Sequence, residues 1–136
     1  MRIVVIDGQG GGLGRAVVEQ ARQALPDAEI IAVGTNALAT QAMLKAGATA
    51  GATGENAVCH NCTRADAIVG ALGIGFANAM HGEISPTMAR AVADSPALKL
   101  LIPITKCNVT VVGVTERTMA QYVAEAVAFL KSESVR

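Results

Sequence analysis

Short apolar runs alternate with segments of helical periodicity along the chain. The run in the first predicted strand, at residues 3–6, is apolar at every position, which indicates a strand that is buried on both faces. Buried strands separated by amphipathic helices are typical of an α/β fold with a mostly parallel sheet in three layers. Strands are predicted at residues 2–7, 29–33, 57–60, 67–71, 99–104 and 109–114, and helices at residues 13–25, 36–47, 85–93 and 118–131.

Two of the predicted connections are short. Only residues 105–108 separate the last two predicted strands, so these strands form a hairpin and the C-terminal edge strand is antiparallel. Residues 61–66 are likewise too few for a regular parallel crossover, so the strand at 57–60 is either short or at an edge of the sheet. The strand order stays open between 3-2-1-4-5 and 2-1-3-4-5.

We expect residues 1–136 to form a single domain. The composition excludes several classes of binding partner for it. Eleven Lys and Arg balance eleven Asp and Glu, which argues against nucleic acid as a partner, and 2% aromatic residues argue against a base-stacking surface. Charged residues make up only 16% of the chain, so we expect a homo-oligomer that buries part of its surface. No apolar run is long enough to span a membrane and no signal peptide is present, which predicts a cytoplasmic protein.

A glycine-rich turn connects the first predicted strand to the first predicted helix. Glycines let backbone N–H groups approach an anion, and a helix N-terminus adds unpaired N–H donors and a positive dipole end. The turn therefore predicts a phosphate-binding loop for a small-molecule nucleotide. The alternative is a tight strand-to-helix turn in which glycine serves packing alone. The candidate binding residues of the turn are Gly8, Gln9, Gly10, Gly11, Gly12, Leu13 and Gly14.

The spacing of Gly8, Gly12 and Gly14 resembles the first turn of short-chain dehydrogenases/reductases. That resemblance implies a Rossmann-like fold that binds a nucleotide or NAD(P). The dinucleotide pattern also implies an acid at the end of the second strand for the ribose hydroxyls. This chain has no acid there, and Thr35 and Asn36 either bind the ribose or cap the next helix. Further candidates that line the cleft are Gly34, Thr35, Asn36, Gly73 and Asn78.

The catalytic Tyr-x-x-x-Lys of the short-chain family does not carry over, because Ala126 follows the single tyrosine, Tyr122, four residues later. Whether the protein is an enzyme therefore stays open, and the expected role is a sensor or accessory module. Blocks at residues 6–12, 34–40, 51–56, 102–104 and 106–108 resemble a family of small bacterial proteins described as a domain of unknown function. This second resemblance implies a stand-alone Rossmann-like domain and supplies no activity.

Cysteines give a rival hypothesis of a metal, iron–sulfur or redox protein. Cys59 and Cys62 form a C-x-x-C motif, and Cys107 is the third candidate ligand. Strand order decides whether they meet, since strands three and five are about 19 Å apart in the order 3-2-1-4-5 and about 10 Å apart in the order 2-1-3-4-5. A third hypothesis is an enzyme completed across a dimer interface, with His81 and Glu83 as its candidate residues.

Overall fold

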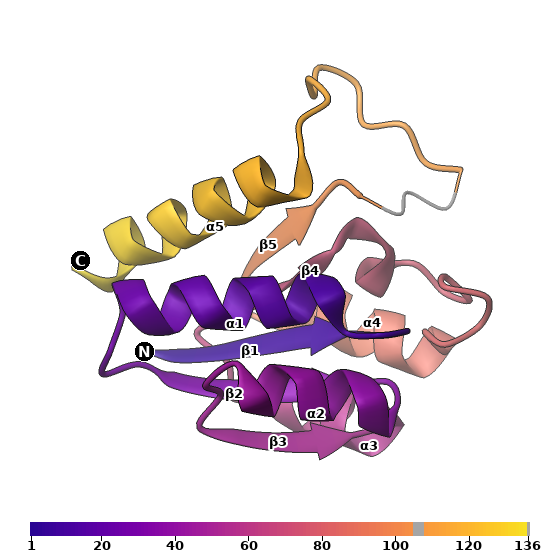
Figure 1. Cartoon of the computed structure of the whole chain (residues 1–136). Coiled ribbons are helices and arrows are strands. Elements are labelled where there is room, and N and C mark those ends of the chain that lie inside the picture. The colour runs from indigo at the N-terminus through magenta and orange to yellow at the C-terminus, as the bar shows by residue number, and fades with distance from the viewer. Residues whose placement is uncertain (105–107, 136) are drawn as a thin grey trace.

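A five-stranded parallel sheet forms the centre of the molecule (Figure 1). The structure is a computed structural model that describes residues 1–104 and 108–135. The strand order is β3-β2-β1-β4-β5, which is the first of the two predicted orders and that of a doubly wound, Rossmann-like sheet. The strands are β1 (Arg2–Asp7), β2 (Glu29–Gly34), β3 (Ala50–Thr53), β4 (Ala67–Ala71) and β5 (Leu98–Ile102).

Helices cover both faces of this sheet and complete the three predicted layers. One layer contains α1, α2 and α5, and the other contains α3, α4 and the short 3-10 helix η1 (Figure 1). The side chains buried between the layers are mainly Val, Ile, Leu, Met and Ala. Among the described residues, none of the helices combines the length and apolar character needed to cross a membrane. The helices are α1 (Gly12–Ala24), α2 (Ala37–Lys45), α3 (Glu55–Cys62), η1 (Leu72–Gly75), α4 (Pro86–Asp94) and α5 (Met119–Ser134).

Strand register brings the ends of the central strands to one level. Asp7, the last residue of β1, pairs with Gly34, the last residue of β2. The turns that follow these two strands therefore lie beside each other at the carboxyl edge of the sheet. In doubly wound folds this edge is where ligands bind.

The third predicted strand was misplaced. Residues 57–60 belong to α3, and β3 lies earlier, between the predicted helix at 36–47 and the predicted strand at 57–60. The buried Val58 and Cys62 are four residues apart, which is helical spacing. The predicted strand at 57–60 is too short to include both residues, so this spacing was not recognised. β3 is mostly exposed and its sequence is Ala-Gly-Ala-Thr, so no apolar pattern marks it; its place is fixed by backbone pairing with β2. With α3 in the crossover, the connection from β3 to β4 has an ordinary length.

The predicted antiparallel edge strand at residues 109–114 was also wrong. These residues form no strand, and β4 and β5 pair in parallel. The segment has turn geometry, since Gly113 has a φ of 87° and the Val114 N–H donates to the Val111 carbonyl. Val112 is 94% exposed, so the β-branched residues that suggested a strand do not pack as one.

Candidate functional site

The glycine turn reverses the chain in a tight bend between β1 and α1. The Gly11 N–H donates to the Gly8 carbonyl at 3.0 Å, and Gly11 caps α1 with a φ of 76°. Gln9 also has a positive φ, 50°, which is uncommon for a residue with a side chain. Gly8 is needed for close approach, because a Cβ there would lie 2.8 Å from Thr35 Oγ1. The turn is thus a defined structure held against the end of β2.

The buried carboxylate of Asp7 holds the turn in place through hydrogen bonds. Asp7 accepts the Gly8 N–H through Oδ1 at 2.8 Å and the Gly14 N–H through Oδ2 at 2.6 Å. Burial raises the pKa of Asp7, and the two backbone hydrogen bonds oppose that shift. Sequence reasoning missed this residue. The signal for it is an acid that ends a fully apolar strand directly before a glycine turn.

Three backbone N–H groups of the turn point to no protein acceptor. Among the described residues, the N–H groups of Gly10, Gly12 and Leu13 have no hydrogen-bond partner. Gly12 and Leu13 belong to the first turn of α1, where no intrahelical acceptor exists. A Cβ added at Gly10 or Gly12 would meet no atom of the described residues within 4 Å. The turn therefore leaves its donors open and the space in front of two glycines empty.

The residues after β2 meet a carboxylate from a distant part of the chain. Asn36 caps α2, since its Oδ1 accepts the Ala39 N–H at 2.9 Å, which confirms the capping alternative. Its amide nitrogen donates to the Gln9 carbonyl and to Glu83 Oε1. The Thr35 hydroxyl donates to the same Glu83 oxygen at 2.6 Å. Thr35, Asn36 and the turn are therefore joined through Glu83.

The other predicted cleft residues do not line the pocket that lies against the turn. Gly34 ends β2 and serves packing, because a Cβ there would lie 2.6 Å from the Thr40 backbone nitrogen. Gly73 is buried in η1, and Asn78 is exposed in the loop after it. A pocket of about 160 Å³ lies against the turn, and from this part of the chain it contacts Ala71 and Met80 instead. The pocket is smaller than the roughly 300 Å³ of typical small-molecule sites, so it suits a compact group such as a phosphate.

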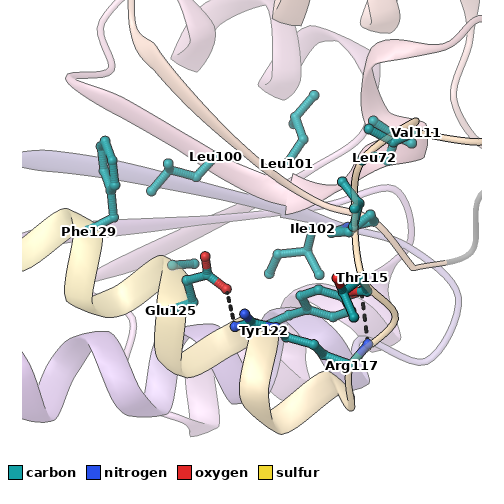
Figure 2. Close-up of a pocket in the computed structure, with 14 residues that line it drawn as sticks. Leu72, Leu100, Leu101, Ile102, Val111, Thr115, Arg117, Tyr122, Glu125 and Phe129 are labelled. Carbon is teal, nitrogen blue, oxygen red and sulfur yellow. Dashed lines mark hydrogen bonds and ion pairs between the residues drawn. The ribbon is translucent and has the colours of Figure 1, made fainter.

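A second pocket, of about 480 Å³, lies between β5 and α5 and was not predicted (Figure 2). We call it the β5–α5 pocket. At its rim Arg117 pairs with Glu125 at 2.9 Å, and the Tyr122 hydroxyl accepts the Arg117 N–H and donates to the Thr115 carbonyl. Its lining is mainly apolar and comprises Leu72, Leu100, Leu101, Ile102, Pro103, Val111, Gly113, Val114, Thr115, Arg117, Tyr122, Glu125, Ala126 and Phe129.

The cysteine pair lies away from the glycine turn. Cys59 and Cys62 are in α3, which runs back toward the start of β4, so the expectation that Cys62 shares the carboxyl edge was wrong. Burial raises the pKa of Cys62 to about 11, with a further rise from Cys59, and this disfavours thiolate chemistry. Cys107 is outside the described residues. Among the described residues, no group of three or more His, Cys, Asp or Glu side chains is placed to hold a metal ion.

Comparison with known proteins places the chain in a family. The family described as "Domain of unknown function (DUF3842)" matches residues 2–135. The chain belongs to this family. The match confirms the resemblance to a domain of unknown function, and the family's description adds no activity. No curated protein matches the chain.

One solved structure with a similar fold is a dodecameric FMN-dependent Ubix-like decarboxylase from Escherichia coli O157:H7. The likeness has a TM-score of 0.48 and 14% sequence identity, and it covers 100% of this chain and 95% of that chain. Similarity at this level carries no ligand or activity over to the family.

Proposed function

We propose that this protein binds a nucleotide or dinucleotide by its phosphate groups at the glycine turn. The observation that carries the proposal is the pair Gly10 and Gly12. Neither has a positive φ, and a Cβ on either would meet nothing within 4 Å in the part of the chain that the structure describes. Packing and backbone conformation thus account for Gly8, Gly11 and Gly14 but give no reason for glycine at these two positions. A ligand that approaches the backbone closely supplies that reason.

The donors at this place suit a phosphate group. The N–H groups of Gly10, Gly12 and Leu13, which have no partner among the described residues, lie at the positive end of a 13-residue helix. No acidic residue occupies the first turn of α1 itself. The pocket of about 160 Å³ accommodates the phosphate, and the rest of the nucleotide extends along the carboxyl edge of the sheet.

The proposed role is binding, as a sensor or an accessory module that works as a homo-oligomer. NAD(P) is within the proposed ligand class, because its pyrophosphate would meet the same donors. The proposal assigns no bond-making step to the protein.

Gly12→Glu tests the phosphate site. The new side chain enters open space at a helix N-terminus, where glutamate is tolerated, so the fold is expected to remain intact. Its carboxylate competes with the phosphate for the same donors. Isothermal titration with pyrophosphate, ADP, NAD⁺ and FMN should give a loss of about 30-fold or more, equivalent to about 2 kcal/mol, for every probe that the unaltered protein binds.

Gln23→Glu is the matched control. It adds the same carboxylate at an exposed position 11 residues further along α1, about 16 Å from Gly12. Affinity should change by less than about twofold in this variant, because surface charges this far apart are largely screened. Equal affinities in the Gly12→Glu and unaltered proteins, or no binding of any probe at millimolar concentration, would contradict the proposal.

A further inference from the structure

Glu83 places a carboxylate at the tip of β2, although it follows β4 in the chain. Its Oε1 accepts three hydrogen bonds, from the Thr35 hydroxyl at 2.6 Å, the Gln9 N–H at 3.0 Å and the Asn36 amide at 3.1 Å. Thr35 and Gln9 are 48 and 74 residues away in sequence. The contact is therefore a property of the fold, and it joins the glycine turn to the end of β2.

The loop that carries Glu83 is ordered by its own hydrogen bonds and by burial. The Asn78 N–H donates to the Ile84 carbonyl at 2.7 Å, and the Ile84 N–H donates to the Ala79 carbonyl at 3.1 Å. Ala79, Met80 and Ile84 are buried in the core. Asn78, Met80 and His81 all have positive φ, a strained conformation that persists only where the surrounding structure imposes it. The loop thus presents Glu83 in one fixed position.

One oxygen of this carboxylate remains available. All three protein donors bind Oε1, and among the described residues Oε2 has no partner. The hydrogen bond from Thr35, followed by that from Gln9, lowers the pKa of Glu83, so the group is ionised at neutral pH. Glu83 is only partly buried, and its free oxygen is therefore an accessible acceptor beside the turn.

The carboxylate of Glu83 and the proposed phosphate use different N–H groups of the glycine turn. Glu83 accepts the N–H of Gln9, while the N–H groups of Gly10, Gly12 and Leu13 have no acceptor among the described residues. In dinucleotide folds an acid at the end of the second strand accepts hydrogen bonds from the ribose hydroxyls. Here β2 ends without an acid, and Glu83 occupies that place from another element.

We propose that Glu83 is the ribose acceptor of the nucleotide site, with Oε2 accepting hydrogen bonds from the ribose hydroxyls, and that it selects a free 2′-hydroxyl over a 2′-phosphate. The proposal rests on the proposed phosphate site at the glycine turn. A 2′-phosphate would bring a second negative group against the ionised carboxylate, and like charges at contact distance repel strongly. The ligand class is then a nucleotide or dinucleotide with an unmodified ribose.

The experiment compares NAD⁺ with NADP⁺, which differ by the 2′-phosphate, in the full chain and in Glu83→Gln. The unaltered protein should bind NAD⁺ at least tenfold more tightly than NADP⁺. Glu83→Gln should bring that ratio to within about threefold, because the amide oxygen can still accept from Thr35 while the charge is lost. Pyrophosphate, which has no ribose, should bind Glu83→Gln at least as tightly as the unaltered protein, because the substitution removes a negative charge beside the turn.

Glu29→Gln is the matched control, since Glu29 starts β2 and lies at the opposite end of the same strand. It should leave the ratio unchanged. A ratio unaltered by Glu83→Gln, or a preference of the unaltered protein for NADP⁺, would overturn the ribose role. If either occurs while Gly12→Glu still abolishes pyrophosphate binding, the ribose role alone fails; if pyrophosphate and both dinucleotides fail to bind, the phosphate site fails and the ribose role with it.

Discussion

The glycine turn and the β5–α5 pocket are neighbours at the carboxyl edge of the sheet, but different parts of the chain build them. Consecutive residues, Ala71 and Leu72, contact the two pockets. The turn offers backbone N–H groups and empty space in front of Gly10 and Gly12. The β5–α5 pocket offers side chains, with apolar walls and a rim fixed by Tyr122 (Figure 2).

Because the two regions are built differently, substitutions should damage them in different ways. A region made of backbone loses stability when an added Cβ meets atoms that are already packed there, because the Cβ has no room. A region made of side chains is damaged when atoms are removed, because contacts and hydrogen bonds disappear. Substitutions in the two regions should therefore follow opposite rules.

The largest difference in stability is expected between substitutions of two glycines in α1, Gly14 and Gly12. A Cβ at Gly14 would lie 2.5 Å from Met43 Sδ and 2.8 Å from Asp7 Cβ. Gly14→Ala should therefore lower the free energy of unfolding by about 2–3 kcal/mol through overpacking. Gly12→Ala enters open space and should raise it by up to about 1 kcal/mol. Urea denaturation followed by circular dichroism measures both; equal effects would show that Gly12 also serves packing.

These two glycines show what could and could not be predicted from the sequence. The spacing of Gly8, Gly12 and Gly14 located the turn between β1 and α1, and the structure has both elements there. The sequence could not separate a glycine that permits packing from one that leaves space. That distinction depends on Met43 and Asp7, which approach Gly14 only after α2 and β1 have packed against α1.

Caps and buried strands were predictable because their causes are local. Asn36 and Ser85 cap α2 and α4 through side-chain bonds to residues three positions later. β3 and the Glu83 contact were not predictable, because both depend on partners far away in the chain. β3 has no apolar pattern and is fixed by β2, while Glu83 reaches Thr35 across 48 residues.

A moderate effect is expected when one atom is removed from the β5–α5 pocket. Tyr122→Phe deletes the hydroxyl that accepts the Arg117 N–H at 3.1 Å and donates to the Thr115 carbonyl at 3.0 Å. Losing a hydroxyl with two partners should lower the free energy of unfolding by about 1–2 kcal/mol. Hydrogen exchange at residues 115–117 should accelerate as well, because the hydroxyl ties this segment to α5.

Glu125→Gln is the control for that substitution in the same pocket. It breaks the exposed ion pair with Arg117, which should cost less than about 0.5 kcal/mol. Urea denaturation compares the two variants. If Glu125→Gln costs as much as Tyr122→Phe, the rim is held by charge and not by the tyrosine hydroxyl.

The smallest effect is expected in the acid response of the two carboxylates that flank the turn. Burial raises the pKa of Asp7 above its ordinary value, so the folded protein binds a proton there more readily than the unfolded chain. Asp7 therefore opposes the loss of stability as the pH falls toward that ordinary value. The hydrogen bond from Thr35 lowers the pKa of Glu83, so its stabilising contribution is complete above its ordinary value and is lost as the pH falls through the folded one.

The two variants should consequently change the slope of stability against pH in opposite directions. Between pH 7 and 3, Glu83→Gln should lose free energy of unfolding less steeply than the unaltered protein, and Asp7→Asn more steeply. Asp7→Asn also weakens the bonds from Gly8 and Gly14, but that cost is the same at every pH and shifts the curve without changing its slope. Three parallel curves in urea titrations would mean that neither carboxylate has a shifted pKa. The hydrogen bonds from Thr35 and Gln9 would then not favour the ionised form of Glu83.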